Sequence, residues 1–161
     1  MDGANLFQLG IGLETGAHAE DTRVCNTDTQ PNRDIFDADR EDHFIRRDGR
    51  VFAGTHLIIE VVDGTGLDDE ARIAQAFRDC VDECGATLLL IHTHKFSPQG
   101  VSGVAVLAES HISVHTWPEN GYAAFDIFMC GDAEPEKAAA VLERALSPQR
   151  TVISEHRRGV M

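Results

Sequence analysis

Four short runs of apolar and β-branched residues follow one another between residues 87 and 129, and this succession limits the possible folds more than any other feature. The runs are Thr87–His92, Val101–Leu107, Leu107–Glu119 and Ala123–Met129. Runs of this length and composition are typical of β-strands. The connections between them are too short for a helical crossover, so neighbouring strands are expected to pair antiparallel. Because Thr87–His92 is apolar throughout, we predict that it is a central strand of the sheet.

Two segments with helical periodicity lie on either side of this block. Leu67–Cys84 carries apolar residues at helical spacing and is followed by Gly85, and Glu134–Leu146 has a proline suited to its first turn. Adding the strands Thr55–Val62 and Thr151–Ser154 gives the order β-α-β-β-β-β-α-β. This order predicts an α+β fold, a two-layer sandwich in which two helices cover one face of a mainly antiparallel sheet. The other face needs a cover, which dimerisation would supply.

The apolar runs are confined to the later part of the chain. Residues 1–50 are mostly polar and acidic, and we expect them to form a partly disordered N-terminal extension to a folded domain at 51–161. The short apolar patch Leu6–Leu13 could dock on this domain or on a partner subunit. With 161 residues, the chain is long enough for one domain with a substantial core.

Charge and cysteine content restrict the environment and the partners. The net charge of −13 disfavours nucleic acid and anionic membranes as partners; it is either a solvated acidic surface or a means of steering a cationic ligand. The four cysteines form no CxxC pair and are expected to be reduced thiols in the cytoplasm. The first residues lack the basic region of a signal peptide, and no run approaches the roughly 20 apolar residues of a membrane span.

Proton-handling side chains are concentrated around the step Glu109–Ser110. His92 with His94 and His111 with His115 would each share a strand face, and with Cys130 they could form a zinc site. No metal-binding motif is present, and we predict no metal. Ser110 and His115 could form a nucleophile and a base. On a straight strand, however, they would face opposite sides of the sheet, and the GxSxG elbow of hydrolases is absent.

Three further residues each have a structural and a functional interpretation. Cys130 ends an apolar run and is either a small buried residue or a proton donor facing a pocket. Phe96 lies in a loop, where it either fills a gap or forms a stacking wall for a flat ligand. Glu119 is either a solvated turn carboxylate or an acceptor for ligand hydroxyls.

Long stretches of the chain resemble the bacterial S-adenosylmethionine decarboxylase proenzymes. The resemblance covers residues 54–159 and rests on the segments Phe96–Val104, Ala108–Glu119, Gly121–Gly131, Gly54–Leu57 and Glu155–Gly159. Members of this family make their own cofactor by cutting their backbone. The resemblance therefore implies a carboxy-lyase, a zymogen that is processed to chains 1–109 and 110–161.

The resemblance implies a role for each matched residue in this chemistry. The Ser110 hydroxyl attacks the Glu109 carbonyl, and β-elimination converts Ser110 into a pyruvoyl group that forms a Schiff base with S-adenosylmethionine. His115 matches the histidine that handles protons during cleavage, and Ser102 matches the serine that assists it. Cys130 matches the acid that protonates the product carbon, for which a thiol with a near-neutral pKa would be competent.

Substrate contacts and assembly are also implied by the resemblance. Phe96 and His115 match the pair that flanks adenine, and Glu119 matches the residue that binds the ribose hydroxyls. The product would supply the aminopropyl group for spermidine biosynthesis. The working unit would be a homodimer of cleaved protomers with active sites near the subunit boundary.

Two alternatives remain open at this stage. The same pyruvoyl chemistry could act on ornithine or arginine, although such an enzyme would not need the nucleoside contacts of Phe96 and Glu119. The chain could instead be a binding or regulatory homologue that never cleaves itself.

Overall fold

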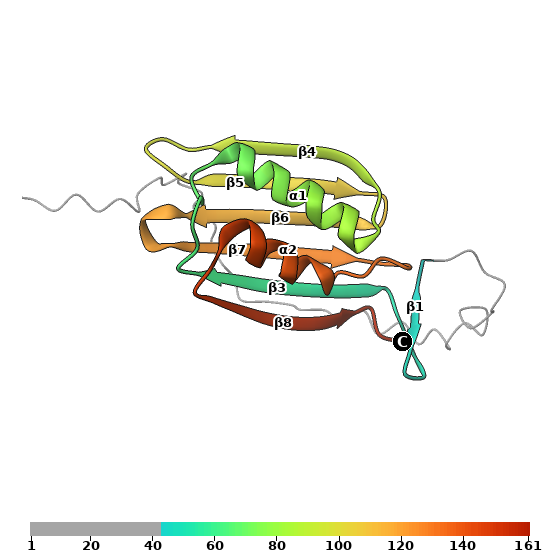
Figure 1. Cartoon of the computed structure of the whole chain (residues 1–161). Helices are drawn as coiled ribbons and strands as arrows, with labels where there is room; N and C mark the ends of the chain where they lie inside the picture. The colour runs from blue at the N-terminus through green and yellow to red at the C-terminus, as the bar shows by residue number, and fades with distance from the viewer. Residues whose placement is uncertain (1–42) are drawn as a thin grey trace, which may run out of the picture. The chain divides into compact units, whose positions relative to one another are not determined.

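A six-stranded antiparallel sheet with two helices on one face forms the body of the computed structural model, which describes residues 43–161 (Figure 1). The elements in chain order are β1 (Ile45–Arg47), β2 (Arg50–Phe52), β3 (Gly54–Val62), α1 (Glu70–Cys84), β4 (Leu88–Lys95), β5 (Val101–Leu107), β6 (Ser110–Trp117), a short 3-10 helix (Pro118–Asn120), β7 (Tyr122–Met129), α2 (Lys137–Leu146) and β8 (Arg150–Arg158). The predicted α+β sandwich is confirmed.

The strand order in the sheet is β4-β5-β6-β7-β3-β8, and every neighbouring pair is antiparallel. The prediction of a central strand at Thr87–His92 is wrong, because β4 lies at the edge of the sheet, where Leu89 is 64% exposed. An apolar run indicates that a strand prefers an apolar neighbour. It does not indicate that this neighbour belongs to the same chain.

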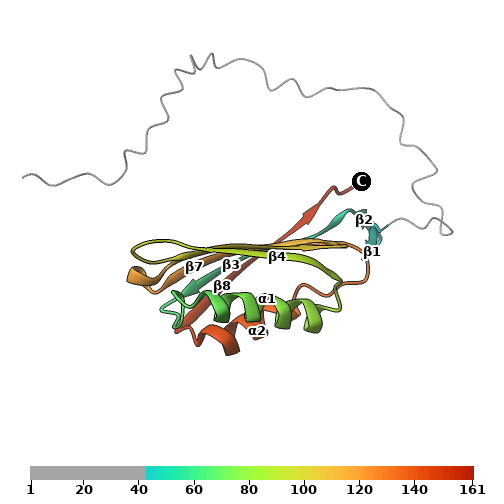
Figure 2. The same ribbon diagram turned by 90° about the horizontal axis from the view of Figure 1, so that it is seen from above.

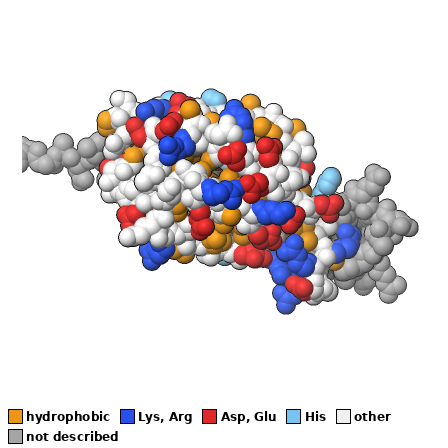
Figure 3. Space-filling model, in the orientation of Figure 1, with side chains coloured by type: hydrophobic (Ala, Val, Ile, Leu, Met, Phe, Trp, Pro, Cys, Tyr) orange, Lys and Arg blue, Asp and Glu red, His pale blue; other side chains and the backbone are white. Residues whose placement is uncertain are grey.

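The core lies between the sheet and the helices, which both occupy the same side of the sheet (Figure 2). Alternate residues of β3, β6 and β7 are buried there, including Ile59, Ile112 and Phe125. Helix α1 begins where the Asp69 side chain accepts a hydrogen bond from the Arg72 amide, and it ends at Gly85 in the left-handed conformation. On the helix side, acidic and basic side chains are interspersed over the surface (Figure 3).

The opposite face of the sheet is covered by no helix of the described residues. Directly paired residues on neighbouring strands point to the same face, and the register therefore assigns the residues of this open face. His94, Ser102 and His115 form one row across β4, β5 and β6. The histidines on the open face are His56, His92, His94, His111, His115 and His156.

A hairpin of β1 and β2 precedes the main sheet and is part of the described structure. Phe52 is fully buried, and the amide of Met161 donates to the carbonyl of Val51. This hairpin crosses the boundary expected between residues 50 and 51. Residues 1–42, including the patch Leu6–Leu13, lie outside the described residues. No helix of the described part of the chain is long and apolar enough to cross a membrane.

Candidate active site

The first group of candidate residues, which we call the Ser110 cluster, consists of Glu109 and Ser110, where β5 turns into β6, and Cys130, which follows β7. The carbonyl oxygen of Glu109 accepts two hydrogen bonds from Cys130, one from its amide at 3.1 Å and one from its Sγ at 2.9 Å. Two donors on one carbonyl polarise it and would stabilise an oxyanion at the same position. The arrangement arises because Ser110 pairs with Met129, which places the end of β7 beside the turn.

The backbone at Ser110 has an unusual conformation. Its φ angle is +150°, a value that residues with a side chain rarely adopt. The Ser110 hydroxyl lies 3.2 Å from Nδ1 of His111. Backbone strain is therefore located at the residue that follows the polarised carbonyl.

Protonation in the Ser110 cluster is set by burial and by nearby donors. Burial raises the pKa of the Cys130 thiol, and the charge of Glu109 raises it further. The near-neutral pKa expected for this thiol from the sequence does not hold in the uncut chain, and the thiol remains protonated at neutral pH. Burial acts to raise the pKa of Glu109, but hydrogen bonds from Thr87 and the proximity of His43 lower it overall. The Glu109 carboxylate accepts the Thr87 amide at 2.8 Å.

A cavity of about 430 Å³ opens beside the Ser110 cluster. In addition to the three cluster residues, its lining consists of His43, Phe44, Ala53 and Phe128. Three of these four side chains are apolar or aromatic hydrocarbon. The cavity therefore offers a small, largely apolar compartment next to the polarised carbonyl.

The second group, which we call the His115 cluster, comprises Phe96, Ser102 and His115; Glu119 lies apart from it on the 3-10 helix that follows β6. The Ser102 hydroxyl and Nδ1 of His115 are hydrogen-bonded. The rings of Phe96 and His115 lie 5.6 Å apart, and Phe96 is 41% exposed. These two rings and the nearby Trp117, whose ring lies 4.3 Å from His115, form an exposed aromatic surface.

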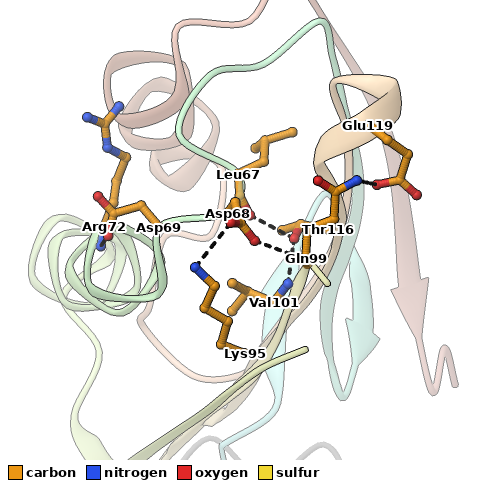
Figure 4. Close-up of polar contacts among 10 residues, drawn as sticks. Leu67, Asp68, Asp69, Arg72, Lys95, Gln99, Val101, Thr116 and Glu119 are labelled. Carbon is orange, nitrogen blue, oxygen red and sulfur yellow. Dashed lines mark hydrogen bonds and ion pairs between the residues drawn. The ribbon is translucent and has the colours of Figure 1, made fainter. Parts of the chain in front are cut away.

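The loop that carries Phe96 is held by polar contacts that the sequence analysis missed (Figure 4). Asp68 accepts the Gly100 amide at 2.8 Å and pairs with Lys95 at 3.1 Å. These contacts lower the pKa of Asp68, the Gly100 hydrogen bond most of all. Gln99 donates to Glu119 at 3.1 Å. Asp68 lies just before α1, far from the loop in sequence, so no local signal could have identified its role.

The two clusters lie at opposite ends of β6. Ser110 begins the strand and His115 follows five residues later, which corresponds to about 17 Å along an extended chain. The structure thus brings Ser110 together with Cys130 and Glu109, and His115 together with Ser102 and Phe96. Within one chain it does not bring His115 to Ser110.

A metal centre has no counterpart among residues 43–161. In this part of the chain, no group of three or more His, Cys, Asp or Glu side chains is arranged to hold a metal ion. On the open face, His94 and His115 are separated by Ser102, whereas His56 and His156 are directly paired.

Comparisons with known proteins agree on one family. The model of a family described as S-adenosylmethionine decarboxylase matches residues 55–159. An S-adenosylmethionine decarboxylase proenzyme of Methanococcus aeolicus is 53% identical over 111 residues, which cover 67% of this chain and 95% of the relative. A proenzyme of the same name from Parasynechococcus marenigrum is 52% identical over 108 residues, which cover 65% of this chain and 84% of the relative.

The fold has a counterpart of known structure. The crystal structure of an adenosylmethionine decarboxylase from Aquifex aeolicus matches with a TM-score of 0.63 at 31% identity. The match covers 68% of this chain and 93% of the other.

Proposed function

The chain belongs to the S-adenosylmethionine decarboxylase family, and we propose that it is a proenzyme that cuts itself between Glu109 and Ser110 to create a pyruvoyl group. The observation that carries the proposal is the pair of hydrogen bonds from Cys130 to the Glu109 carbonyl, next to the strained backbone of Ser110. Together they favour attack on this one peptide bond.

Self-cleavage needs no external reagent other than water. Ser110 Oγ attacks the Glu109 carbonyl carbon, the peptide C–N bond breaks, and an ester links Glu109 to the Ser110 side chain. Loss of the Ser110 Cα proton then breaks the Cβ–Oγ bond and releases Glu109 as a terminal carboxylate. Tautomerisation and addition of water at residue 110 expel ammonia and leave the pyruvoyl group. The Cys130 donors would stabilise the oxyanion in the first step.

The residues present fit the cofactor that the family implies. Ser110 begins a strand at the edge of the cavity beside Cys130, so a carbonyl formed there would face space for a ligand. When present, the pyruvoyl ketone supplies an electron sink for decarboxylation, as a cofactor carbonyl does in other decarboxylases. Cys130, a protonated thiol in the same cavity, is suited to deliver a proton to the product carbon.

The separation of the two clusters supports a homodimer packed through the open face of the sheet. If two copies met face to face about a two-fold axis near the middle of β6, Ser110 of one copy would approach His115 of the partner subunit. The exposed leucines of β4 and the aromatic surface at Phe96 and Trp117 would gain apolar neighbours in such an assembly. Each active site would then contain residues of both chains.

The His115 cluster supports a nucleoside substrate over ornithine or arginine. Phe96 and His115 offer ring faces on which adenine can stack, and Glu119 on the 3-10 helix after β6 can accept the ribose hydroxyls. A small amino acid would use neither. We place the reaction in the cytoplasm, where Cys130 and the other free thiols of the described residues would stay reduced.

Mass spectrometry of the purified chain tests the proposal directly. We expect two chains, 1–109 and 110–161, with the second blocked at its N-terminus by a keto group that borohydride or a hydrazine traps. We also expect carbon dioxide release from carboxyl-labelled S-adenosylmethionine. A single uncut chain without a trappable carbonyl would support the non-enzymatic alternative and would overturn the proposal.

A further inference from the structure

Three residues from outside the family match, His43, Phe44 and Ala53, line the cavity at the proposed cleavage site. His43 and Phe44 lie well before the matched segment, which begins at residue 55, yet both line the same cavity as Ser110 and Cys130. The carbonyl of His43 accepts the Gly131 amide at 2.8 Å, which ties this segment to the residue after Cys130. The position of His43 is therefore set by the same turn that carries the proposed proton donor.

The His43 imidazole lies beside the backbone of Gly131, the residue after Cys130. A Cβ atom added to Gly131 would lie 3.7 Å from its Nδ1, so the ring packs against the backbone beside Cys130. Its proximity is also one of the influences that lower the pKa of Glu109. Among the described residues that line this cavity, His43 is the only one with a basic side chain. Arg158 contacts the Phe128 ring, but its guanidinium bonds to His56 and does not line the cavity.

Cleavage changes the charge of this compartment. Before cleavage, Glu109 contributes one carboxylate, whose side chain accepts the Thr87 amide. Afterwards, the same residue carries a second carboxylate at its new terminus. The substrate also brings an α-carboxylate, which must approach residue 110 before it is lost. Three negative groups at one cavity repel one another, because Coulomb repulsion rises as like charges are brought close together.

We propose that His43 is a substrate-positioning residue whose imidazole balances the negative charge at Glu109 and thereby admits the substrate's carboxylate to the cavity beside residue 110. This inference rests on the proposed function, since it assumes cleavage at Glu109 and an amino acid substrate. It adds a residue of the N-terminal segment to the active site. It also predicts discrimination between the substrate and its decarboxylated product, because the product lacks the group that His43 accommodates.

The test compares His43→Gln with His43→Lys in the full-length chain, with His18→Gln as the matched control. Glutamine keeps hydrogen-bonding capacity but cannot become positively charged, whereas lysine can. Maturation is followed by mass spectrometry, KM and kcat by carbon dioxide release, and product affinity by inhibition with decarboxylated S-adenosylmethionine. We expect His43→Gln to mature normally and to raise KM about tenfold, equivalent to about 1.4 kcal/mol of binding.

The same variant should leave the inhibition constant of the product unchanged, and His43→Lys should recover most of the lost affinity. Equal weakening of substrate and product, or no recovery with lysine, would mean that His43 only supports the fold and would overturn the proposal. An unchanged KM would do the same. If the wild-type chain itself stayed uncut, the fault would lie with the proposed function, which the same mass measurement identifies.

Discussion

The two ends of β6 differ in almost every physical property that matters for catalysis. At the Ser110 end, a strained backbone, a doubly hydrogen-bonded carbonyl and a partly buried thiol lie around a cavity of about 430 Å³. At the His115 end, aromatic rings and a serine–histidine hydrogen bond lie on an exposed sheet face. The first end is suited to bond cleavage, and the second to proton transfer and to binding a flat group. In the proposed mechanism, neither end alone supplies every residue that the reaction needs.

Removing the proposed nucleophile at the Ser110 end should have the largest effect on cleavage and activity. Ser110→Ala lacks the hydroxyl that attacks Glu109, so we expect an uncut chain of 17.6 kDa with no decarboxylase activity. The His115 cluster should be unaffected, and the variant should fold. Intact-mass measurement and circular dichroism check both expectations. Cleavage at the same position in this variant would show that another residue is the nucleophile.

Mixing two inactive variants tests whether the two ends meet across a subunit boundary. His115→Ala should stall or slow its own maturation because the proton-handling imidazole is missing. Co-expression with Ser110→Ala should restore cleavage of the His115→Ala chain, since the partner subunit's intact His115 would serve its Ser110. Tagged chains distinguished by mass provide the measurement. Complete absence of cleavage in mixed assemblies would contradict a shared site.

Substitution of Cys130 should reduce turnover but leave maturation intact. Cys130→Ala keeps the backbone amide that binds the Glu109 carbonyl, so the chain should still mature. It loses the thiol proton donor, so kcat should fall by about 10²- to 10⁴-fold, the range for a lost general acid. Cys130→Ser is the isosteric control, with a hydroxyl that is a weaker acid. A fully active Cys130→Ala would show that another group delivers the proton.

The same thiol predicts the alkaline limit of activity. Burial raises the pKa of Cys130 in the folded chain, so the protonated donor persists to a higher pH than for a free cysteine. The activity that depends on it should be complete below the usual thiol range of about 8.5 and should decline only as the pH rises through the raised value. A kcat profile against pH checks this, and a decline centred below neutrality would contradict it.

The smallest effect is expected for substitution of Asp68, which holds the Phe96 loop in place. Asp68→Asn weakens the contacts to Gly100 and Lys95 that hold this loop. We expect KM to rise about two- to threefold with kcat unchanged, as for the loss of one exposed ionic contact. Glu119→Gln, which alters a proposed ribose contact, should raise KM more. If the wild type, Asp68→Asn and Glu119→Gln had the same KM and kcat, the Phe96 loop would not be part of the binding site.

The linear sequence was sufficient for the local part of this structure. Alternation of apolar residues, short connections and helix-ending glycines depend on neighbours a few positions apart, and they predicted the order of the main elements and their antiparallel pairing. The motif around Glu109–Ser110 led to the family in the same way. These features survive in any arrangement of the strands, which is why they could be found without coordinates.

Long-range pairing decided what local patterns could not. β3 lies between β7 and β8, which leaves β4 at an edge despite its apolar composition. The straight course of β6 separates Ser110 from His115, and the contact with Gly131 brings His43 to the cavity from outside the family match. Such placements depend on the free energy of packing segments far apart in the chain, and no short window of sequence carries that information.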